Sequence, residues 1–134
     1  MNHVNGTLQS GKRNIKEESA RIVRGVIKDV SDLNAHHYDA IFLPGGFGVA
    51  KNLSDFAYHG ADMEVDPEIV RVLKDFHLEK KLMGFCCISP IIAAKVFGKK
   101  SGGPGLVLTL GSVGEHWPYH GSIEVAKGFG NELV

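Results

Sequence analysis

The sequence predicts an α/β domain in which helices cover a parallel β-sheet. Three short apolar segments, at 39–43, 82–86 and 106–110, are typical of buried strands, and helical patterns alternate with them along the chain. Strands that alternate with helices are joined by right-handed crossovers and form a parallel sheet. The first two strands run into a glycine-rich turn and a cysteine turn, and ligands collect beyond such strand ends.

The region before the first strand is predicted to contain one amphipathic helix. Apolar residues recur among Lys, Glu and Arg over 14–24, and Gly25 is expected to end this helix. An extended stretch over 26–30 and a short helical or looped connection from Ser31 to Leu33 lead to the first strand.

The helices after the first strand are predicted from their capping residues and periodicity. The clearest runs from Asp66 to Lys80, because Asp66 is a favourable N-cap, Pro67 suits the first helical position and apolar residues recur on one face. Other helices are expected at 50–58, at 89–96, where Gly98 ends the helix, and at 123–129, with surface loops at 60–62 and 99–105. Phe76, Phe85 and Phe97 are assigned to the core.

Composition bounds the class of protein. A chain of 134 residues with 43% hydrophobic and 22% charged residues can bury one core, so we expect a single domain over 1–134. Fifteen basic residues balance fifteen acidic ones, which removes the electrostatic argument for nucleic acid or an anionic membrane as partner. No apolar stretch approaches the roughly 20 residues of a membrane helix, and Met1 to Gly11 shows no secretory or transit peptide.

The number of strands indicates an incomplete domain. Parallel sheets need cover on both faces and usually contain more than the three strands predicted here. We therefore expect a complete domain of this type to need extra strands before Met1 or after Val134. Open strand edges favour pairing with another chain, so a homo-oligomer or a protein partner is expected.

Cys87 is the candidate nucleophile. It follows the second strand at a predicted sharp turn, where the amino end of the next helix stabilises a thiolate. Cys86, one residue earlier, is expected to point to the opposite side and to pack as a small hydrophobe. The alternative is that both cysteines are inert, because a cysteine in an apolar strand is more often core than nucleophile.

The glycine loop after the first strand is the second candidate element. Gly45, Gly46 and Gly48 permit a tight turn whose amides can converge with the Ile88 amide on an oxyanion. The same glycines would also suit close packing or a phosphate, although the spacing lacks the dinucleotide-binding pattern. Together with the Cys87 turn about 40 residues later, the loop favours a catalytic site.

Four segments resemble the ElbB-like family of the ThiJ/PfpI branch of class I glutamine amidotransferase-like proteins. Residues 39–54 and 84–90 are similar to its hallmark loops, 13–25 resembles its preceding helix, and 117–121 resembles the vertebrate mitochondrial members. The resemblance implies a flavodoxin-like sandwich, a nucleophile-elbow cysteine at Cys87, and an oxyanion site from the Gly46 and Ile88 amides. It also implies a mitochondrial location, with a cytoplasmic one as the alternative.

The resemblance implies an activity that this sequence supports only in part. Bacterial relatives are associated with weak glyoxalase chemistry, in which a cysteine hemithioacetal leads to addition of water to a small reactive dicarbonyl. Family members begin earlier, with a strand and a helix whose glutamate contacts the elbow cysteine, and they continue into further strands and a closing helix. We expect this chain to lack those regions and with them the acidic partner of Cys87.

A histidine near the thiol is also not evident. Ile88 occupies the position where some branches of the superfamily carry histidine, and His77-Leu78-Glu79 is upstream on a predicted surface face, so true glutaminase chemistry is not expected. His116 and His120, after the third strand, are auxiliary candidates that more often would be exposed loop residues. No metal site and no cofactor are expected.

Two hypotheses of function follow. In the first, the chain is a cysteine-dependent enzyme acting on a small carbonyl metabolite, with Cys87 as nucleophile and the Gly46 and Ile88 amides as the oxyanion site. In the second, it is a non-catalytic or inactive variant that binds a protein partner or senses oxidation through its thiol.

Overall fold

The computed structural model describes residues 4–5, 7, 11, 13–112, 114 and 119–134. The chain divides into two compact units, Met1–Leu33 and Asn34–Val134. Of the sequence predictions, those on residues 115–118, including His116, lie outside the described residues.

The first unit contains helix α1 (Ile15–Val23) and the short 3-10 helix η1 (Val30–Asp32). The Asn14 side chain caps α1 by accepting hydrogen bonds from the amides of Lys16 and Glu17. The helix ends at Arg24 rather than at Gly25, because Arg24 itself adopts the left-handed conformation, with φ of 56°, and donates its N–H to the Ala20 carbonyl. None of the residues of α1 is buried.

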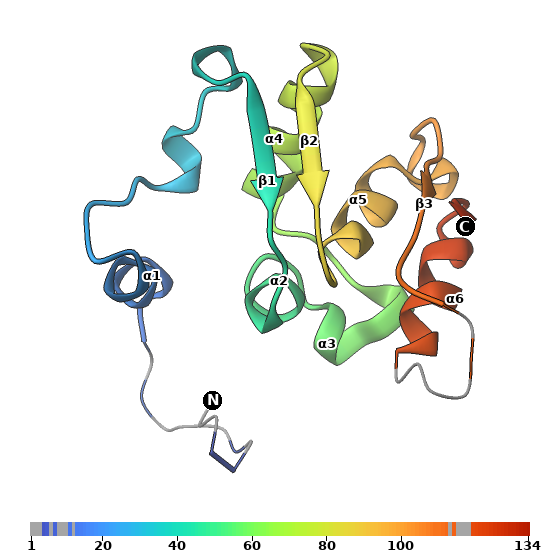
Figure 1. Cartoon of the computed structure of the whole chain (residues 1–134), viewed down its shortest axis with the longest axis horizontal. Helices are drawn as coiled ribbons and strands as arrows, with labels where there is room; N and C mark the ends of the chain where they lie inside the picture. The colour runs from blue at the N-terminus through green and yellow to red at the C-terminus, as the bar shows by residue number, and fades with distance from the viewer. Residues whose placement is uncertain (1–3, 6, 8–10, 12, 113, 115–118) are drawn as a thin grey trace. The chain divides into compact units, whose positions relative to one another are not determined.

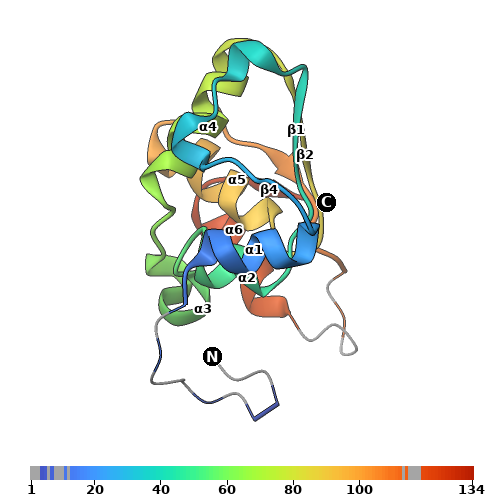
Figure 2. The ribbon, with the colours of Figure 1, turned by 90° about the vertical axis from the view of Figure 1, so that its left-hand side faces the viewer.

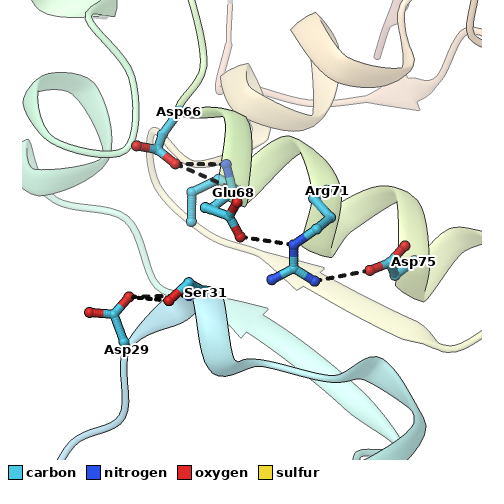
Figure 3. Close-up of polar contacts among 7 residues, drawn as sticks. Asp29, Ser31, Asp66, Glu68, Arg71 and Asp75 are labelled. Carbon is cyan, nitrogen blue, oxygen red and sulfur yellow. Dashed lines mark hydrogen bonds and ion pairs between the residues drawn. The ribbon is translucent and has the colours of Figure 1, made fainter.

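Asp29 organises the start of η1. Its Oδ1 accepts hydrogen bonds from the amide and the hydroxyl of Ser31, at 3.2 and 2.9 Å (Figure 3). These bonds stabilise the charged carboxylate, the backbone one most, and hold the pKa of Asp29 below its ordinary value.

The second unit carries most of the regular structure. In order along the chain (Figure 1), its elements are η2 (Ala35–His37), β1 (Ala40–Leu43), α2 (Phe47–Lys51), α3 (Phe56–His59), η3 (Gly60–Asp62), α4 (Pro67–Leu78), β2 (Leu82–Phe85), α5 (Pro90–Phe97), η4 (Lys99–Ser101), β3 (Val107–Leu108), α6 (His120–Gly128) and β4 (Glu132–Leu133).

The described strands form two separate parallel pairs. Strand β1 pairs with β2, with Ala40 opposite Leu82. The third predicted strand, 106–110, shortens to β3 and pairs with β4, a strand that the sequence did not predict. The Asn131 side chain explains this pairing, because its oxygen accepts the Leu106 amide at 3.0 Å while its nitrogen donates to carbonyls of α5 and α6. The parallel α/β arrangement is confirmed, whereas β3 does not join the β1–β2 pair within the described residues.

The helix predicted at 50–58 is two helices, α2 and α3. Gly46, with φ of 89°, lets α2 begin at Phe47, earlier than predicted. The break between the helices is fixed by Ser54, which is buried, forms a bridge with Val65 and donates its hydroxyl to the Val49 carbonyl at 2.7 Å.

The core lies between the β1–β2 pair and helices α4, α5 and α6. Helix α4 contacts β2, and α5 packs against both α4 and α6. Figure 2 shows β1 and β2 edge-on with α4 and α5 on the same side of them. Every residue of α5 except Lys95 is buried, whereas Phe42 of β1 and Leu82 of β2 remain 61% and 76% exposed. The loops that follow β1 and β2 are therefore supported by a buried helix, α5, on one face of the strands, while the other face is open to solvent.

Within the described residues, no helix is both long and apolar enough to cross a membrane.

Helix α4 confirms the clearest sequence prediction and offers a test of it. The Asp66 carboxylate accepts hydrogen bonds from the amides of Glu68 and Ile69, at 2.9 and 3.4 Å, as an N-cap (Figure 3). Further along, Glu68 and Asp75 both bind the Arg71 guanidinium, which raises the pKa of Arg71, chiefly through the hydrogen bond to Glu68.

We predict that Asp66→Ala lowers the free energy of unfolding by about 1 kcal/mol, because two amides of the first turn lose their acceptor. Urea denaturation followed by circular dichroism measures the change. The matched control is Asp62→Ala on the exposed surface of η3, which should change stability by less than about 0.5 kcal/mol. Equal effects of the two substitutions would contradict the capping role.

Candidate active site at the Cys87 turn

Residues 86–89, the Cys87 turn, connect the end of β2 to the start of α5. The amide of Ser89 donates to the Cys86 carbonyl at 3.0 Å and closes the turn. Cys87 has φ of 56°, a left-handed conformation that residues other than glycine seldom adopt. Such local strain persists only where the surrounding structure enforces it, and it concentrates at functional sites.

The Ser89 hydroxyl enforces the turn. Ser89 is fully buried, and its Oγ accepts the Cys86 amide at 2.8 Å. The same Oγ lies 2.6 Å from the Leu43 carbonyl and 2.8 Å from the Cys86 carbonyl, so its single proton donates to one of these oxygens. The Cys86 amide also donates to the Leu43 carbonyl at 3.0 Å. These bonds join the Cys87 turn to the carboxyl end of β1.

Sequence reasoning assigned Ser89 only to the start of a helix and missed this role. The available signal was a serine directly before Pro90 at a strand-to-helix turn. A short hydroxyl there can reach the backbone of the turn, as serine does in many turns and caps.

The glycine loop lies directly against the Cys87 turn, as predicted. A Cβ on Gly45 would be 2.7 Å from the Cys86 carbonyl oxygen and 2.8 Å from the Cys87 Cβ, so no side chain fits there. Gly45 and Gly46 also have φ of 93° and 89°, conformations that favour glycine. The two loops that the sequence singled out are therefore neighbours in space.

The amides of Gly46 and Ile88 are the predicted donors of the oxyanion site. Neither donates a hydrogen bond to another group of the described part of the chain. Both residues line the same pocket as Cys87. The sequence prediction that they form an oxyanion site remains a prediction, with this geometry in its favour.

The pocket beside Cys87 is open to solvent and has a volume of about 590 Å³. Its walls come from α2, α3, the Cys87 turn, the segment after β3 and the start of α6. The lining residues are Gly46, Phe47, Ala50, Phe56, Ala57, Phe85, Cys86, Cys87, Ile88, Pro90, Thr109, Leu110, Gly111, Tyr119 and Ser122.

The prediction that Cys86 packs as a buried hydrophobe was wrong. Both cysteines are exposed, and both line the pocket. The physical reason is that β2 ends at Phe85, so the alternation of side chains along a strand no longer applies to Cys86. Phe85 likewise contributes to the pocket and is only half buried, whereas Phe76 and Phe97 are in the core as predicted.

None of the described histidines lines the pocket. His120 is exposed at the first position of α6, next to the pocket residue Tyr119. His77 is at the surface of α4, as predicted, with its ring 5.0 Å from that of Phe97. Among the described residues, no group of three or more His, Cys, Asp and Glu side chains comes together to hold a metal ion.

Helix α3, one wall of the pocket, is held by Asp55. Its Oδ1 accepts the Glu64 amide at 2.7 Å, and its Oδ2 lies 2.8 Å from Nδ1 of His59. The Glu64 amide, and after it His59, lower the pKa of Asp55 below its ordinary value of 3.8. Because the pKa of Asp55 is lower in the folded chain than in the unfolded chain, the charged carboxylate stabilises the fold. This stabilisation is fully present above the unfolded pKa and is lost as the pH falls through the folded pKa. The Asp55 carboxylate therefore keeps its charge, and its hydrogen bond from the Glu64 amide, at neutral pH.

We predict that Ser89→Ala lowers the free energy of unfolding by about 1–3 kcal/mol, because buried backbone groups of the turn lose a hydrogen-bonding partner. Urea denaturation measures the change. Ser101→Ala, at an exposed position of η4, is the matched control and should cost less than about 0.5 kcal/mol. A Ser89→Ala variant as stable as this control would contradict the role assigned to the hydroxyl.

Comparison with known proteins finds clear relatives of the chain, although no protein-family model matches it. Glutamine amidotransferase-like class 1 domain-containing protein 3, mitochondrial, from Homo sapiens is 46% identical over 134 residues, which cover 97% of this chain and 48% of that protein. The mitochondrial ES1 protein homolog of Rattus norvegicus is 48% identical, covering 88% of this chain and 43% of the relative. The mitochondrial ES1 protein of Danio rerio is 34% identical, with 90% and 46% covered.

A solved structure shares the fold. The isoprenoid biosynthesis protein with an amidotransferase-like domain from Ehrlichia chaffeensis superposes with a TM-score of 0.78 at 28% identity, over 99% of this chain and 56% of that one. This likeness confirms the predicted fold class, a flavodoxin-like α/β arrangement of parallel strands and helices.

The chain spans about half the length of the relatives it matches. The three relatives are mitochondrial proteins, which agrees with the location implied by the sequence resemblance. By sequence identity and by shared fold, the chain is a homologue of about half the length of the ES1 and glutamine amidotransferase-like class 1 proteins.

Proposed function

We propose that the chain carries a cysteine-dependent site of the ElbB-like type, in which Cys87 is the nucleophile of an elbow and adds to the carbonyl of a small reactive dicarbonyl. The observation that carries the proposal is the conformation of Cys87. Its thiol is exposed at a strained strand-to-helix turn, and that turn is held by Ser89 and by the close approach of Gly45.

The chemistry is a glyoxalase-type hydration. The Cys87 thiolate adds to the aldehyde carbon and forms a hemithioacetal, whose oxyanion accepts hydrogen bonds from the Gly46 and Ile88 amides. The hydrogen on that carbon then leaves as a proton, and a proton returns to the neighbouring carbonyl carbon, which yields a thioester. Water hydrolyses the thioester to a 2-hydroxy acid and restores the thiol. One carbon is oxidised and its neighbour reduced, so no external redox partner is needed.

Slow turnover is expected. None of the described residues that line the pocket is a histidine or a carboxylic acid, so they offer no strong acid or base for the proton transfers. A Cys-His-Glu arrangement for glutamine hydrolysis is likewise not formed among these residues. We therefore place the site closer to weak dicarbonyl hydration than to glutaminase activity.

A second candidate function is redox sensing. The observation in its favour is that two adjacent thiols, Cys86 and Cys87, are both exposed on the same pocket. Peroxide oxidises an exposed thiolate to a sulfenic acid, and a second thiol condenses with the sulfenic acid to form a disulfide and water.

We predict that the purified chain consumes methylglyoxal and forms lactate, and that Cys87→Ala abolishes this turnover while Cys86→Ala lowers it far less. Coupled detection of lactate measures the rate. Equal loss in both variants would contradict the assignment of Cys87 as the nucleophile. No turnover, with sulfenic acid formed at Cys87 by dilute peroxide and trapped by dimedone, would favour the redox function instead.

A further inference from the structure

The side chains that line the pocket beside Cys87 have one chemical character. Phe47 of α2, Phe56 of α3 and Phe85 at the end of β2 contribute aromatic rings, and Ile88 and Leu110 contribute aliphatic groups. The described lining contains no Asp, Glu, Lys, Arg or His, and its ionisable side chains are the two cysteines and Tyr119. The Ser122 hydroxyl, one of the few polar groups in this lining, already donates to the Tyr119 carbonyl at 2.7 Å.

The apolar, aromatic lining favours some classes of ligand over others. An anionic group that enters the pocket gives up hydration, and the described lining residues offer no cationic side chain in return. An apolar or aromatic group gains from leaving water and from contact with the rings. The α-carboxylate of glutamine, or a carboxylate on any other substrate, is therefore disfavoured.

The volume of the pocket also favours a ligand with a large apolar group. Its volume of about 590 Å³ lies within the range of roughly 300–1,000 Å³ found for pockets that hold drug-sized molecules. A three-carbon dicarbonyl would leave much of this space unfilled. Phe47 is also 68% exposed, so a large aromatic surface remains in contact with solvent at the pocket, although the Lys51 ammonium lies over the ring at 4.9 Å from its centre.

We propose that this pocket binds neutral molecules with an apolar substituent of about the size of a phenyl ring, and that the carbonyl substrates of Cys87 are of this class. The part that concerns substrates rests on the proposed function. The part that concerns binding does not, because it follows from the walls of the pocket alone.

The test compares maleimides that differ only in their substituent. The rates at which N-phenylmaleimide and the negatively charged N-(2-carboxyethyl)maleimide modify Cys87 are measured on the whole chain by tandem mass spectrometry. Each rate is divided by that of glutathione with the same reagent, which removes intrinsic reactivity. We expect a normalised preference of at least about tenfold for the phenyl reagent, the size of effect that one hydrophobic contact provides. Equal normalised rates would overturn the proposal.

Helix α3 supplies a matched pair of variants. Ala57 is exposed and lines the pocket, whereas Tyr58 is exposed on the same helix and is not among the lining residues. Ala57→Glu introduces a charge into the pocket and should remove most of the phenyl preference, and Tyr58→Glu should leave it unchanged. Loss of the preference in both variants, or in neither, would contradict binding in this pocket.

Protection of the wild-type chain provides a measurement that needs no variant. Benzamide, a neutral aromatic, should slow modification of Cys87 by iodoacetamide, while benzoate and acetamide at the same concentration should not. Protection by none of the three overturns the proposal. A phenyl preference without any dicarbonyl turnover would refute the proposed enzyme and leave the binding inference intact. Methylglyoxal turnover without a phenyl preference would support the proposed enzyme and refute the binding inference.

Discussion

The hydrogen bonds around the Ser89 hydroxyl are the constraint on which the site depends. The Ser89 Oγ accepts the Cys86 amide and lies 2.6 Å from the Leu43 carbonyl, and the Cys86 amide also donates to that carbonyl. The end of β2 is therefore fixed to the end of β1 at the point where both strands leave the sheet. Cys87 is held in a left-handed conformation immediately beside this junction. A residue in that conformation would relax without such support, because the strain costs on the order of 1–3 kcal/mol. Burial of Ser89 and of helix α5 behind it makes the support rigid.

The same constraint shapes the pocket. Because the turn is fixed against β1, the loop that follows β1 must pass within van der Waals distance of Cys87, and only glycine at position 45 permits this. Gly46 then starts α2, which brings Phe47 and Ala50 to the pocket wall. The hydrogen bonds at Ser89 and the close approach of Gly45 together fix where the thiol, the Gly46 and Ile88 amides and the apolar walls meet.

The sequence was sufficient for the elements whose signals are local. Asp66 and Pro67 predicted the start of α4, and the glycine and cysteine turns predicted two neighbouring loops at strand ends, because caps and turns are encoded in a few adjacent residues. Features that depend on contacts distant in sequence were missed. The pairing of β3 with β4 rests on Asn131, and the break between α2 and α3 rests on the bridge between Ser54 and Val65. The exposure of Cys86 was missed for another reason, because it depends on the residue at which β2 ends. The apolar character of the pocket also became visible only when residues from five segments were brought together.

The most direct test of the account is alkylation of the native and the urea-unfolded chain by iodoacetamide, with tandem mass spectrometry to resolve Cys86 from Cys87. If the turn positions Cys87 as a nucleophile, Cys87 reacts faster than Cys86 in the native chain, and the difference disappears on unfolding. Equal rates for the two thiols, unchanged by urea, would show that the fold does not activate Cys87 and would contradict the account.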